Sequence, residues 1–232
     1  MNKEVIEDSA VELIQPQLEA IQARVLGALM EKQQTTPDAY PLTLNSLVIG
    51  CNQKTSREPV THYTSGDIQH CLRELADNSL VNIDPSGRAD RFAQRLTNEL
   101  GIDKAKQALL NVMLLRGAQT IHELLTRTQR MHSFDTDQEV EDILDELCQQ
   151  SPPMVQRIAK QTGQRDDRFV HLLCGEPDLT SIASKRSQTH ASVSPQSNEQ
   201  IEALEARITE LEKKIEFLIA ELDITMPQSD SN

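Results

Sequence analysis

The spacing of hydrophobic positions predicts a series of short helices at the start of the chain. Between residues 18 and 32, apolar side chains recur at helical intervals up to the helix-breaking sequence Thr35-Thr36-Pro37. Thr43 can act as the N-cap of a second helix that runs to about Cys51. A third helix is expected to begin at the N-cap Ser65 and to carry one apolar stripe that faces the core. That stripe consists of Ile68, Cys71, Leu72 and Leu75.

A β-hairpin is expected next, because residues that favour strands at 80–83 and 91–96 flank a turn that contains Gly87. The same order of helix, extended segment, two helices and hairpin then recurs. The repeated elements are expected at 105–115, 119–121, 122–129, 137–149, 154–159 and 168–174.

The repeat also shows in individual residues. The apolar stripe of the third helix recurs at a constant offset of 72, and Arg91-Phe92 recurs as Arg168-Phe169 at an offset of 77. The repeated stripe consists of Val140, Ile143, Leu144 and Leu147. Two amphipathic helices can resemble each other by chance, but an internal repeat better explains the shared order of all the elements.

This pattern predicts a mainly helical α+β fold with small β-hairpins. Three helices followed by a β-ribbon form a winged helix, which is a helix-turn-helix with an added hairpin. We therefore expect two tandem winged-helix domains and a C-terminal coiled-coil helix. The expected divisions are an N-terminal extension at 1–17, winged-helix domains at 18–98 and 99–176, a flexible Ser/Thr-rich linker at 177–198, the coiled-coil helix at 199–223 and a disordered tail at 224–232.

Near the C-terminus, apolar residues alternate at spacings of three and four, which is the heptad pattern of a coiled coil. They are Ile201, Leu204, Ile208, Leu211, Ile215, Leu218 and Leu222. Ile at position a and Leu at position d favour a parallel dimer, in which Arg207 can reach Glu212 of the other chain. The sequence therefore predicts a homodimer. The alternative is a helix that folds back onto its own domains.

Charge and composition narrow the class of protein. The 232 residues carry 23 Lys and Arg against 36 Asp and Glu, a net charge of −13. No apolar run approaches the roughly 18 residues that span a bilayer, and residues 1–15 lack the apolar segment of a signal peptide. The spacing of the four cysteines matches neither a metal knuckle nor a secreted disulfide framework. We therefore expect a cytoplasmic protein with reduced, mostly buried thiols and no membrane contact.

Catalysis is not expected from the motifs. His122-Glu123 lacks the second histidine of a zinc-protease helix, and neither a Gly-rich phosphate loop nor a nucleophile elbow is present. His70 and Cys71 are adjacent on a helix, so their side chains point about 100° apart and cannot act as a base and nucleophile pair. His171 is expected to be structural. The sequence predicts no cofactor and no metal site.

A winged helix commonly binds double-stranded DNA, and basic or amide side chains gather at several expected surface positions. Gln and Arg on the third helix can read base edges, while Lys and Arg in loops and wings can contact phosphates. The candidate DNA-contacting residues are Lys54, Arg57, Gln69, Arg73, Arg88, Arg91, Arg157, Lys160 and Arg165.

The helix at 137–149 is too acidic to be an ordinary recognition helix. Phosphate neutralisation supplies most non-specific affinity for DNA, and this helix would present carboxylates to the phosphates. Six carboxylates of this helix are expected to face solvent. Asp137 is the first, and the candidate partner-binding face consists of Glu139, Glu141, Asp142, Asp145 and Glu146. Such a face is either solvated or a docking site for a basic protein partner.

Several sequence blocks between residues 20 and 175 resemble the bacterial YceH family. They are Ala23-Arg24-Val25-Leu26-Gly27, Glu31-Lys32, Cys51-Asn52-Gln53-Lys54, Arg57-Glu58-Pro59-Val60, Leu115-Arg116-Gly117-Ala118-Gln119-Thr120 and Arg168-Phe169-Val170-His171-Leu172-Leu173. Ala118 stands where the family usually has proline, and Phe169 where tyrosine is common. The resemblance implies a tandem winged-helix protein with a coiled-coil tail, and it supplies no activity.

Two functions from different classes follow. The favoured hypothesis is a dimeric, DNA-binding transcription regulator that contacts DNA through the first domain and the wings. With four to six phosphate contacts, log K should fall against log salt with a slope of about −4 to −5. The alternative is a non-enzymatic scaffold that binds proteins through the acidic face, resembling winged-helix subunits of chromosome-condensing complexes.

Overall fold

Both predicted sets of helices and strands are present in the computed structural model, which describes residues 17–85, 87–160 and 165–178. The chain has a mixed α+β fold with small antiparallel sheets, as predicted. The N-terminal extension, nearly all of the linker, the coiled-coil helix and the tail fall outside the described residues. The seven predicted dimerisation residues, from Ile201 to Leu222, are among them.

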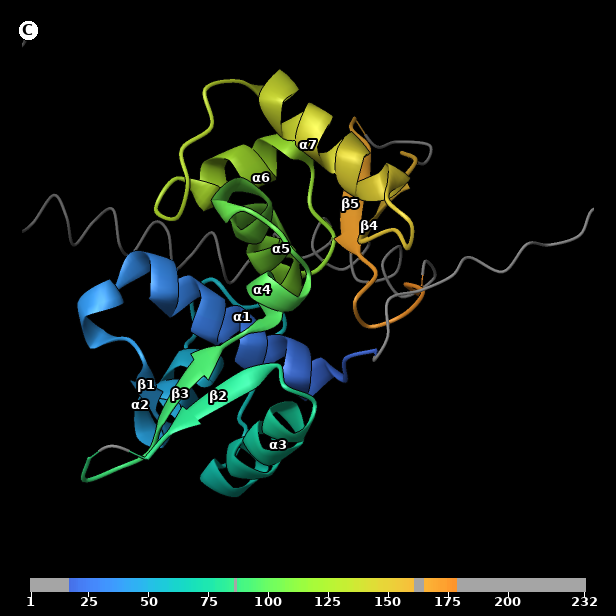
Figure 1. Cartoon of the computed structure of the whole chain (residues 1–232). Coiled ribbons are helices and arrows are strands. Elements are labelled where there is room, and N and C mark those ends of the chain that lie inside the picture. Colours follow the sequence, from blue (N-terminus) through green and yellow to red (C-terminus); the bar gives the residue numbers. More distant parts are fainter. Residues whose placement is uncertain (1–16, 86, 161–164, 179–232) are drawn as a thin grey trace, which may run out of the picture. The chain divides into compact units, whose positions relative to one another are not determined.

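The first repeat (residues 20–99) and the second repeat (residues 104–171) follow one another along the chain (Figure 1). The first contains α1 (Ala20–Thr35), the 3-10 turn η1 (Pro37–Ala39), β1 (Leu42–Thr43), α2 (Leu44–Asn52), α3 (Ser65–Asp77), β2 (Val81–Asp84), β3 (Arg91–Gln94) and α4 (Leu96–Glu99). The second contains α5 (Lys104–Arg116), α6 (Ile121–Thr128), α7 (Asp137–Gln149), β4 (Val155–Ile158) and β5 (Arg168–His171).

Threonine N-caps begin the corresponding helices of the two repeats. Thr43 caps α2 as predicted, and Thr120 caps α6 in the same way. The prediction that Ser65 caps α3 is wrong, because Thr64 is the N-cap. The Thr64 hydroxyl accepts the N–H of Asp67, and the Asp67 carboxylate accepts the N–H of Thr64. A cap at Ser65 would have Ile68 at the reciprocal position, and its side chain cannot accept a hydrogen bond.

The sheets repeat the same register. β3 lies between β1 and β2, all antiparallel, and Leu42 on β1 faces Phe92 on β3. In the second repeat β4 pairs with β5, and Gln119 forms a single bridge to Phe169 in the place of β1. Gly87, at the turn between β2 and β3, has φ +152, as its predicted role requires.

The helix α4 is absent from the sequence prediction, which extended the second strand of the first hairpin to residue 96. That strand ends at Gln94 because the Gln94 side chain turns the backbone into α4. Its amide oxygen accepts the N–H of Thr97 at 3.0 Å, and its amide nitrogen donates to the Thr97 hydroxyl at 2.8 Å. The predicted division between residues 98 and 99 therefore falls within α4.

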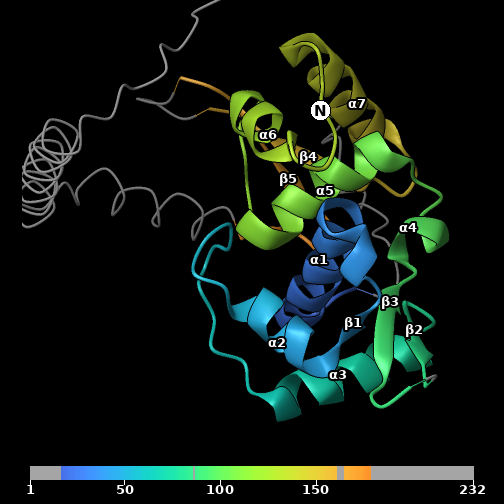
Figure 2. The same ribbon diagram turned by 90° about the vertical axis from the view of Figure 1, so that its left-hand side faces the viewer.

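The helices α1 and α5 pack against each other between the two repeats (Figures 1 and 2). Residues 22–30 of α1 and 107–115 of α5 are buried on every side, so neither helix has the single apolar face that periodicity predicts. Gly27 permits the close approach, because a Cβ there would lie 2.9 Å from Cδ2 of Leu115. The described residues up to Pro177 form one compact unit as a result.

A buried amide joins the two helices. Asn111 of α5 is fully buried, and its side chain reaches the backbone of α1. In the amide orientation that satisfies both groups, it donates to the carbonyl of Gly27 at 2.8 Å and accepts the N–H of Glu31 at 3.1 Å. Because a buried amide without partners is costly, this pair of bonds fixes the register of α5 on α1.

Candidate nucleic-acid interface

The helix α3 presents one polar face to solvent. Its apolar stripe, predicted from the sequence, is buried in full. Gln69 and Arg73, two of the candidate DNA-contacting residues, are exposed and lie one turn apart, so they share a face. Because the apolar stripe faces the core, the Gln69 amide and the Arg73 guanidinium both point to solvent, as a recognition helix requires.

Two of the three acidic groups of α3 are held by other groups of the protein, and the third, Asp77, is exposed one turn after Arg73. Asp67 accepts from both the backbone N–H and the hydroxyl of Thr64 at 2.8 Å, and these bonds lower its pKa. Glu74 lies 3.4 Å from Nε2 of the exposed His70 and accepts a bond from Gln22 at 3.4 Å. Asp67 and Glu74 therefore already have partners, whereas Asp77 adds an exposed carboxylate to the face formed by Gln69 and Arg73.

The hairpin of the first repeat carries two more candidates. Arg88 and Arg91 are both exposed. Arg91 donates from Nη1 to the carbonyl of Pro41 at 2.8 Å, which fastens its side chain to the edge of the sheet next to β1. Arg88 makes no ion pair with any described residue. The hairpin thus offers one anchored and one free cation.

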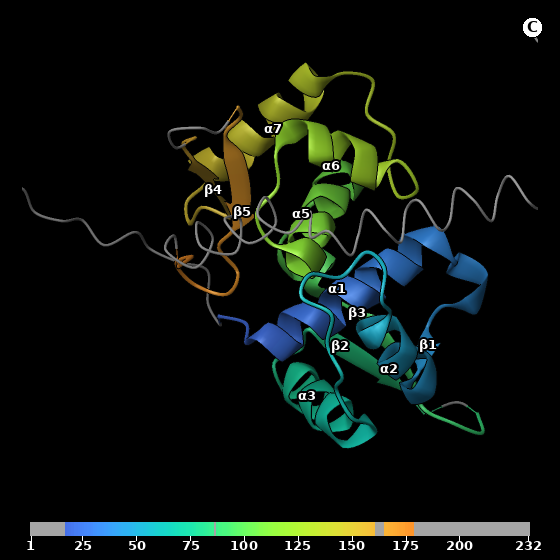
Figure 3. The same ribbon diagram turned by 180° about the vertical axis from the view of Figure 1, so that it is seen from behind.

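The segment between α2 and α3, residues 53–64, crosses α1 towards α5 (Figure 3). The N–H of Glu58 donates to the carbonyl of Leu115 at 2.9 Å, which ties this segment to the second repeat. Lys54 lies at its start, exposed and without an ion pair to any described residue, as a phosphate contact requires.

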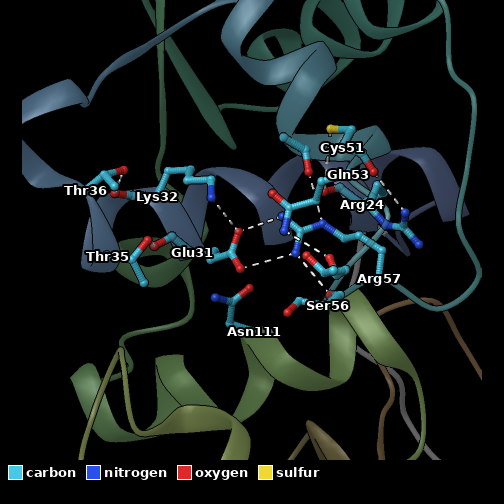
Figure 4. Close-up of polar contacts among 12 residues, drawn as sticks. Arg24, Glu31, Lys32, Thr35, Thr36, Cys51, Gln53, Ser56, Arg57 and Asn111 are labelled. Atoms are coloured by element: carbon cyan, nitrogen blue, oxygen red, sulfur yellow. Dashed lines mark hydrogen bonds and ion pairs between the residues drawn. The ribbon is translucent and has the colours of Figure 1, made fainter. Parts of the chain in front are cut away.

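Arg57 is not a surface residue, and the prediction that it contacts DNA is wrong. Its side chain is 0% exposed. The guanidinium forms a two-pronged ion pair with Glu31 of α1, at 2.6 and 3.2 Å, and Nε donates to the carbonyl of Gly50 at 3.0 Å (Figure 4). A guanidinium enclosed in this way cannot reach a phosphate. It connects α1, α2 and the 53–64 segment instead.

Arg24 of α1 is a second buried cation beside Arg57, and the sequence analysis did not single it out. It donates to the carbonyls of Pro59 at 2.7 Å and Cys51 at 3.1 Å, and to the hydroxyl of Thr61 at 3.0 Å. Burial, followed by the charge of Arg57, lowers the pKa of Arg24. The available signal was an arginine inside an otherwise apolar run. Together the two arginines hold the 53–64 segment in one conformation.

Glu31 is the carboxylate of this buried cluster. Burial disfavours its ionised form, but the hydrogen bonds and charge of Arg57, with a smaller contribution from Lys32, outweigh burial and lower the pKa of Glu31. Lys32 lies 3.3 Å from the same carboxylate. Glu31 is therefore ionised at neutral pH and compensates the charge of Arg57.

In the second repeat, the candidate Arg157 on β4 forms ion pairs with three acidic side chains. It lies 2.7 Å from Asp167, 3.4 Å from Glu141 and 3.9 Å from Asp145. The hydrogen bond to Asp167 raises the pKa of Arg157. A phosphate would have to displace three carboxylates, so Arg157 is a poor candidate for a DNA contact.

These ion pairs also leave fewer carboxylates of the acidic face of α7 available to a partner protein. Besides the two carboxylates beside Arg157, Glu146 pairs with Lys106 of α5 at 2.5 Å. Glu139 accepts the N–H of Asp135 at 2.9 Å near the start of the helix. Asp142 is exposed and accepts a hydrogen bond from Gln138. Four of the five carboxylates predicted to bind a partner thus have partners within the protein that are cationic or backbone groups.

Lys160 and Arg165, the remaining candidates of the second repeat, are exposed. The Lys160 ammonium donates to the carbonyl of Arg165 at 3.4 Å, and the Lys160 N–H donates to Asp167 at 3.0 Å. Both residues line a hollow of about 380 Å³ that also contains Asp137 and Asp166. Cations and carboxylates are mixed in that hollow.

The first repeat has a hollow of about 470 Å³ at the matching place, where α2 and α3 begin and the hairpin turns. Asn45, Ser65 and Asp90 there correspond to His122, Asp137 and Asp167 at the repeat offsets of 77, 72 and 77. Gln69 also lines it, and Asp90 is its one charged residue. The two repeats therefore share a surface shape but differ in charge.

The four cysteines are free thiols, and the prediction that most are buried holds for two of them. Cys51 and Cys71 are buried, Cys148 is half-buried and Cys174 is exposed. Burial raises the pKa of both Cys51 and Cys71 to about 12. These two thiols are therefore protonated and weakly nucleophilic at neutral pH. His70 is exposed while Cys71 is buried, so the two side chains point apart as predicted.

The described residues contain neither a metal-binding cluster nor a membrane-spanning helix. No group of three or more His, Cys, Asp and Glu side chains in this part of the chain is arranged to hold a metal ion. No helix within it is long and apolar enough to span a membrane.

The geometry defines an α+β protein of two similar repeats, each with three main helices and a small antiparallel sheet, and the first repeat adds the short helix α4. A family model described as "Protein of unknown function, DUF480" matches residues 18–164, and the chain belongs to this family. The resemblance to the YceH family is consistent with this assignment.

The chain is similar over most of its length to bacterial proteins of the UPF0502 group. A UPF0502 protein of Cellvibrio japonicus (strain Ueda107) is 52% identical over 209 residues, which cover 89% of this chain and 96% of that protein. One from Ectopseudomonas mendocina (strain ymp) is 44% identical over 192 residues, covering 82% and 88%. UPF0502 protein Smlt0097 of Stenotrophomonas maltophilia (strain K279a) is 41% identical over 204 residues, covering 86% and 93%.

Proposed function

We propose that this chain is a DNA-binding regulatory protein whose two repeats are winged helices and whose first repeat makes the DNA contacts. The order of three helices and a hairpin in each repeat supports the winged-helix interpretation. So does the equivalent pairing of Leu42 with Phe92 and of Gln119 with Phe169.

One observation carries the proposal: three exposed cations of the first repeat make neither an ion pair nor a side-chain hydrogen bond with any described residue. They are Lys54 before α3, Arg73 on α3 and Arg88 in the hairpin. These are the recognition helix, its preceding segment and the wing, which are the parts of a winged helix that meet DNA. Gln69, one turn from Arg73, adds an amide that can read a base edge.

The second repeat lacks this combination. Arg157 is bound by three carboxylates, and α7 carries Glu139, Glu141, Asp142, Asp145 and Glu146. An acidic helix would face the phosphates if α7 entered a groove. The second repeat therefore supports the first through the α1–α5 contact and makes no recognition contact of its own.

The acidic composition sets the expected strength of binding. A net charge of −13 repels DNA at long range. Lys54, Arg73, Arg88 and the anchored Arg91 provide four phosphate contacts. We therefore expect binding at low salt that weakens with a slope of about −4 in log K against log salt.

Fluorescence anisotropy with a random-sequence duplex at 50 mM salt and above tests the proposal. The triple variant Lys54→Glu, Arg73→Glu, Arg88→Glu should abolish binding. The matched control is Arg130→Glu, Lys160→Glu, Arg165→Glu, which makes the same charge change at exposed residues of the second repeat. The proposal fails if the wild-type protein does not bind at 50 mM salt, or if the control weakens binding as much as the first-repeat variant.

We also propose that the protein is a homodimer through the heptads of residues 201–222, whose basis is the sequence pattern alone. Sedimentation of the full-length protein should give the mass of two chains. Leu211→Lys places a charge at a d position and should yield monomers. Ala206→Lys, at the outer f position, should leave the dimer intact. A wild-type monomer would favour a helix that folds back.

A further inference from the structure

The two repeats leave a hollow of about 540 Å³ where the end of α3, the short α4 and the segment after α7 approach one another. Its apolar lining comes from both repeats and from the segments that flank them. The apolar side chains are Leu18, Leu80, Leu96, Leu100, Met154 and Leu173. None of the candidate DNA-contacting residues lines this hollow.

Backbone hydrogen bonds hold the walls of the hollow in place. The N–H of Leu18 donates to the carbonyl of Leu173 at 2.7 Å, which joins two walls that come from opposite ends of the described chain. The N–H of Met154 donates to Leu147 at 3.0 Å, and the Met154 carbonyl accepts from Leu172 at 2.8 Å. The apolar surface is therefore built before any ligand arrives, as in most small-molecule sites.

The polar groups at the rim of the hollow are mostly uncharged. Asn78 and Ser151 are exposed and Gln150 is half-buried, so amide and hydroxyl groups surround the apolar floor. Glu99 is the one charged residue of the lining, and it already lies 3.5 Å from Arg95. No Lys, Arg or His among the described residues lines the hollow, so a ligand anion would find no counter-charge there.

We propose that this hollow binds a small, uncharged molecule that has both an apolar and a polar part. The volume lies within the range of about 300–1,000 Å³ that is usual for ligand pockets, and the site lies where the two repeats meet. The apolar part of the ligand contacts the leucines and Met154, and a neutral polar group of the ligand faces Asn78, Gln150 and Ser151. A carboxylate or sulfonate ligand is disfavoured, because no cation of the described residues lines the hollow to compensate its charge.

Two fluorescent probes with the same ring system test this inference on the full-length protein. N-phenyl-1-naphthylamine is neutral, and 8-anilinonaphthalene-1-sulfonate carries a negative charge. We expect the neutral probe to bind saturably with one molecule per chain. The sulfonate should bind at least about tenfold more weakly.

Variants at the rim locate the binding. Asn78→Trp and Ser151→Trp each place an indole at the mouth of the hollow and should weaken binding of the neutral probe at least about tenfold. Asn82→Trp adds the same side chain at an exposed position of β2 outside the lining and should bind the probe like the wild type. Circular dichroism and melting temperature verify that each variant is folded.

Three results would overturn the inference. The first is a wild-type protein that takes up no neutral probe, as would follow if the chain's own first residues or a second copy filled the hollow. The second is unchanged binding in both folded rim variants. The third is a sulfonate probe that binds as tightly as the neutral one.

Discussion

At the scale of single residues, the position of each arginine decides its role more than its charge does. Arg57 and Arg24 are enclosed and hold the 53–64 segment, whereas Lys54, only three residues before Arg57, faces solvent. Arg157 is exposed but is surrounded by carboxylates. Loss of DNA binding in an Arg57 variant would therefore report on folding and not on a phosphate contact.

We predict that Arg57→Ala lowers the free energy of unfolding by about 3–5 kcal/mol, because the partly buried Glu31 carboxylate loses its two-pronged partner and keeps only Lys32 nearby. Urea denaturation followed by circular dichroism measures the change. Lys54→Ala is the control and should stay within about 0.5 kcal/mol of the wild type, since Lys54 is exposed. A cost below about 1 kcal/mol for Arg57→Ala would contradict the buried ion pair.

The same pair predicts a dependence on pH. The pKa of Glu31 in the folded protein lies below its ordinary value of 4.5. A lowered carboxyl pKa stabilises the fold above that ordinary value, and this contribution is lost as pH falls through the folded pKa. The difference in unfolding free energy between the wild type and Glu31→Gln should therefore be full at pH 7 and shrink below pH 4.5. Urea titrations at several pH values measure it, and a difference that grows with acid would refute it.

At the scale of elements, the contact between α1 and α5 depends on a glycine. The Leu115 side chain occupies the space where a Cβ of Gly27 would lie, at 2.9 Å, and Leu115 is itself buried. Gly50 of α2 offers a matched position, because a Cβ there would lie 3.9 Å from the Cβ of Ala28, which is an ordinary contact.

We predict opposite effects for the same substitution at these two helical glycines. Gly50→Ala should raise the free energy of unfolding by about 0.5–1 kcal/mol, because alanine restricts the unfolded chain and favours the helix. Gly27→Ala gains the same helix preference but forces Leu115 to move, at a cost of about 1–3 kcal/mol. In urea denaturation, the free energy of unfolding of Gly27→Ala should therefore be at least about 1 kcal/mol lower than that of Gly50→Ala. Equal effects would mean that the α1–α5 contact is loosely packed.

At the scale of the whole molecule, the two repeats share a buried interface and are expected to unfold together. The core of the first repeat includes Leu114 of α5, and the carbonyl of Leu115 accepts a bond from the 53–64 segment. Unfolding either repeat alone would expose the apolar residues of α1 and α5 to water. Separate unfolding is therefore unfavourable.

We predict one cooperative thermal transition for the described part of the chain. Scanning calorimetry should give one peak, with the calorimetric enthalpy equal to the van't Hoff enthalpy. Leu144→Ala, in the buried stripe of α7, should lower that single melting temperature by several degrees because it leaves a cavity. A second peak that moves alone in this variant would show that the repeats unfold independently.

The sequence by itself determined the order of the repeated elements, the internal repeat and the N-cap Thr43, because these depend on neighbours within a few residues. The stripe of α3, the N-cap Thr43 and the glycine turn at Gly87 are all readable locally. The choice between Thr64 and Ser65 as N-cap was also local, and it was decided by Asp67 at the reciprocal position.

Only the tertiary structure decided which cationic side chains lack an ion-pair partner within the described part of the chain. Arg57 meets Glu31 across 26 residues of sequence, and Arg157 meets Glu141 from a different element, so neither pairing has a local signal. The burial of α1 on all sides likewise depends on α5, far away in the chain. Periodicity reports which residues one helix turns inward, whereas the exposure of a cation depends on what the rest of the chain places beside it. Once those neighbours are in place, the cations of the candidate interface are Lys54, Arg73, Arg88 and the anchored Arg91.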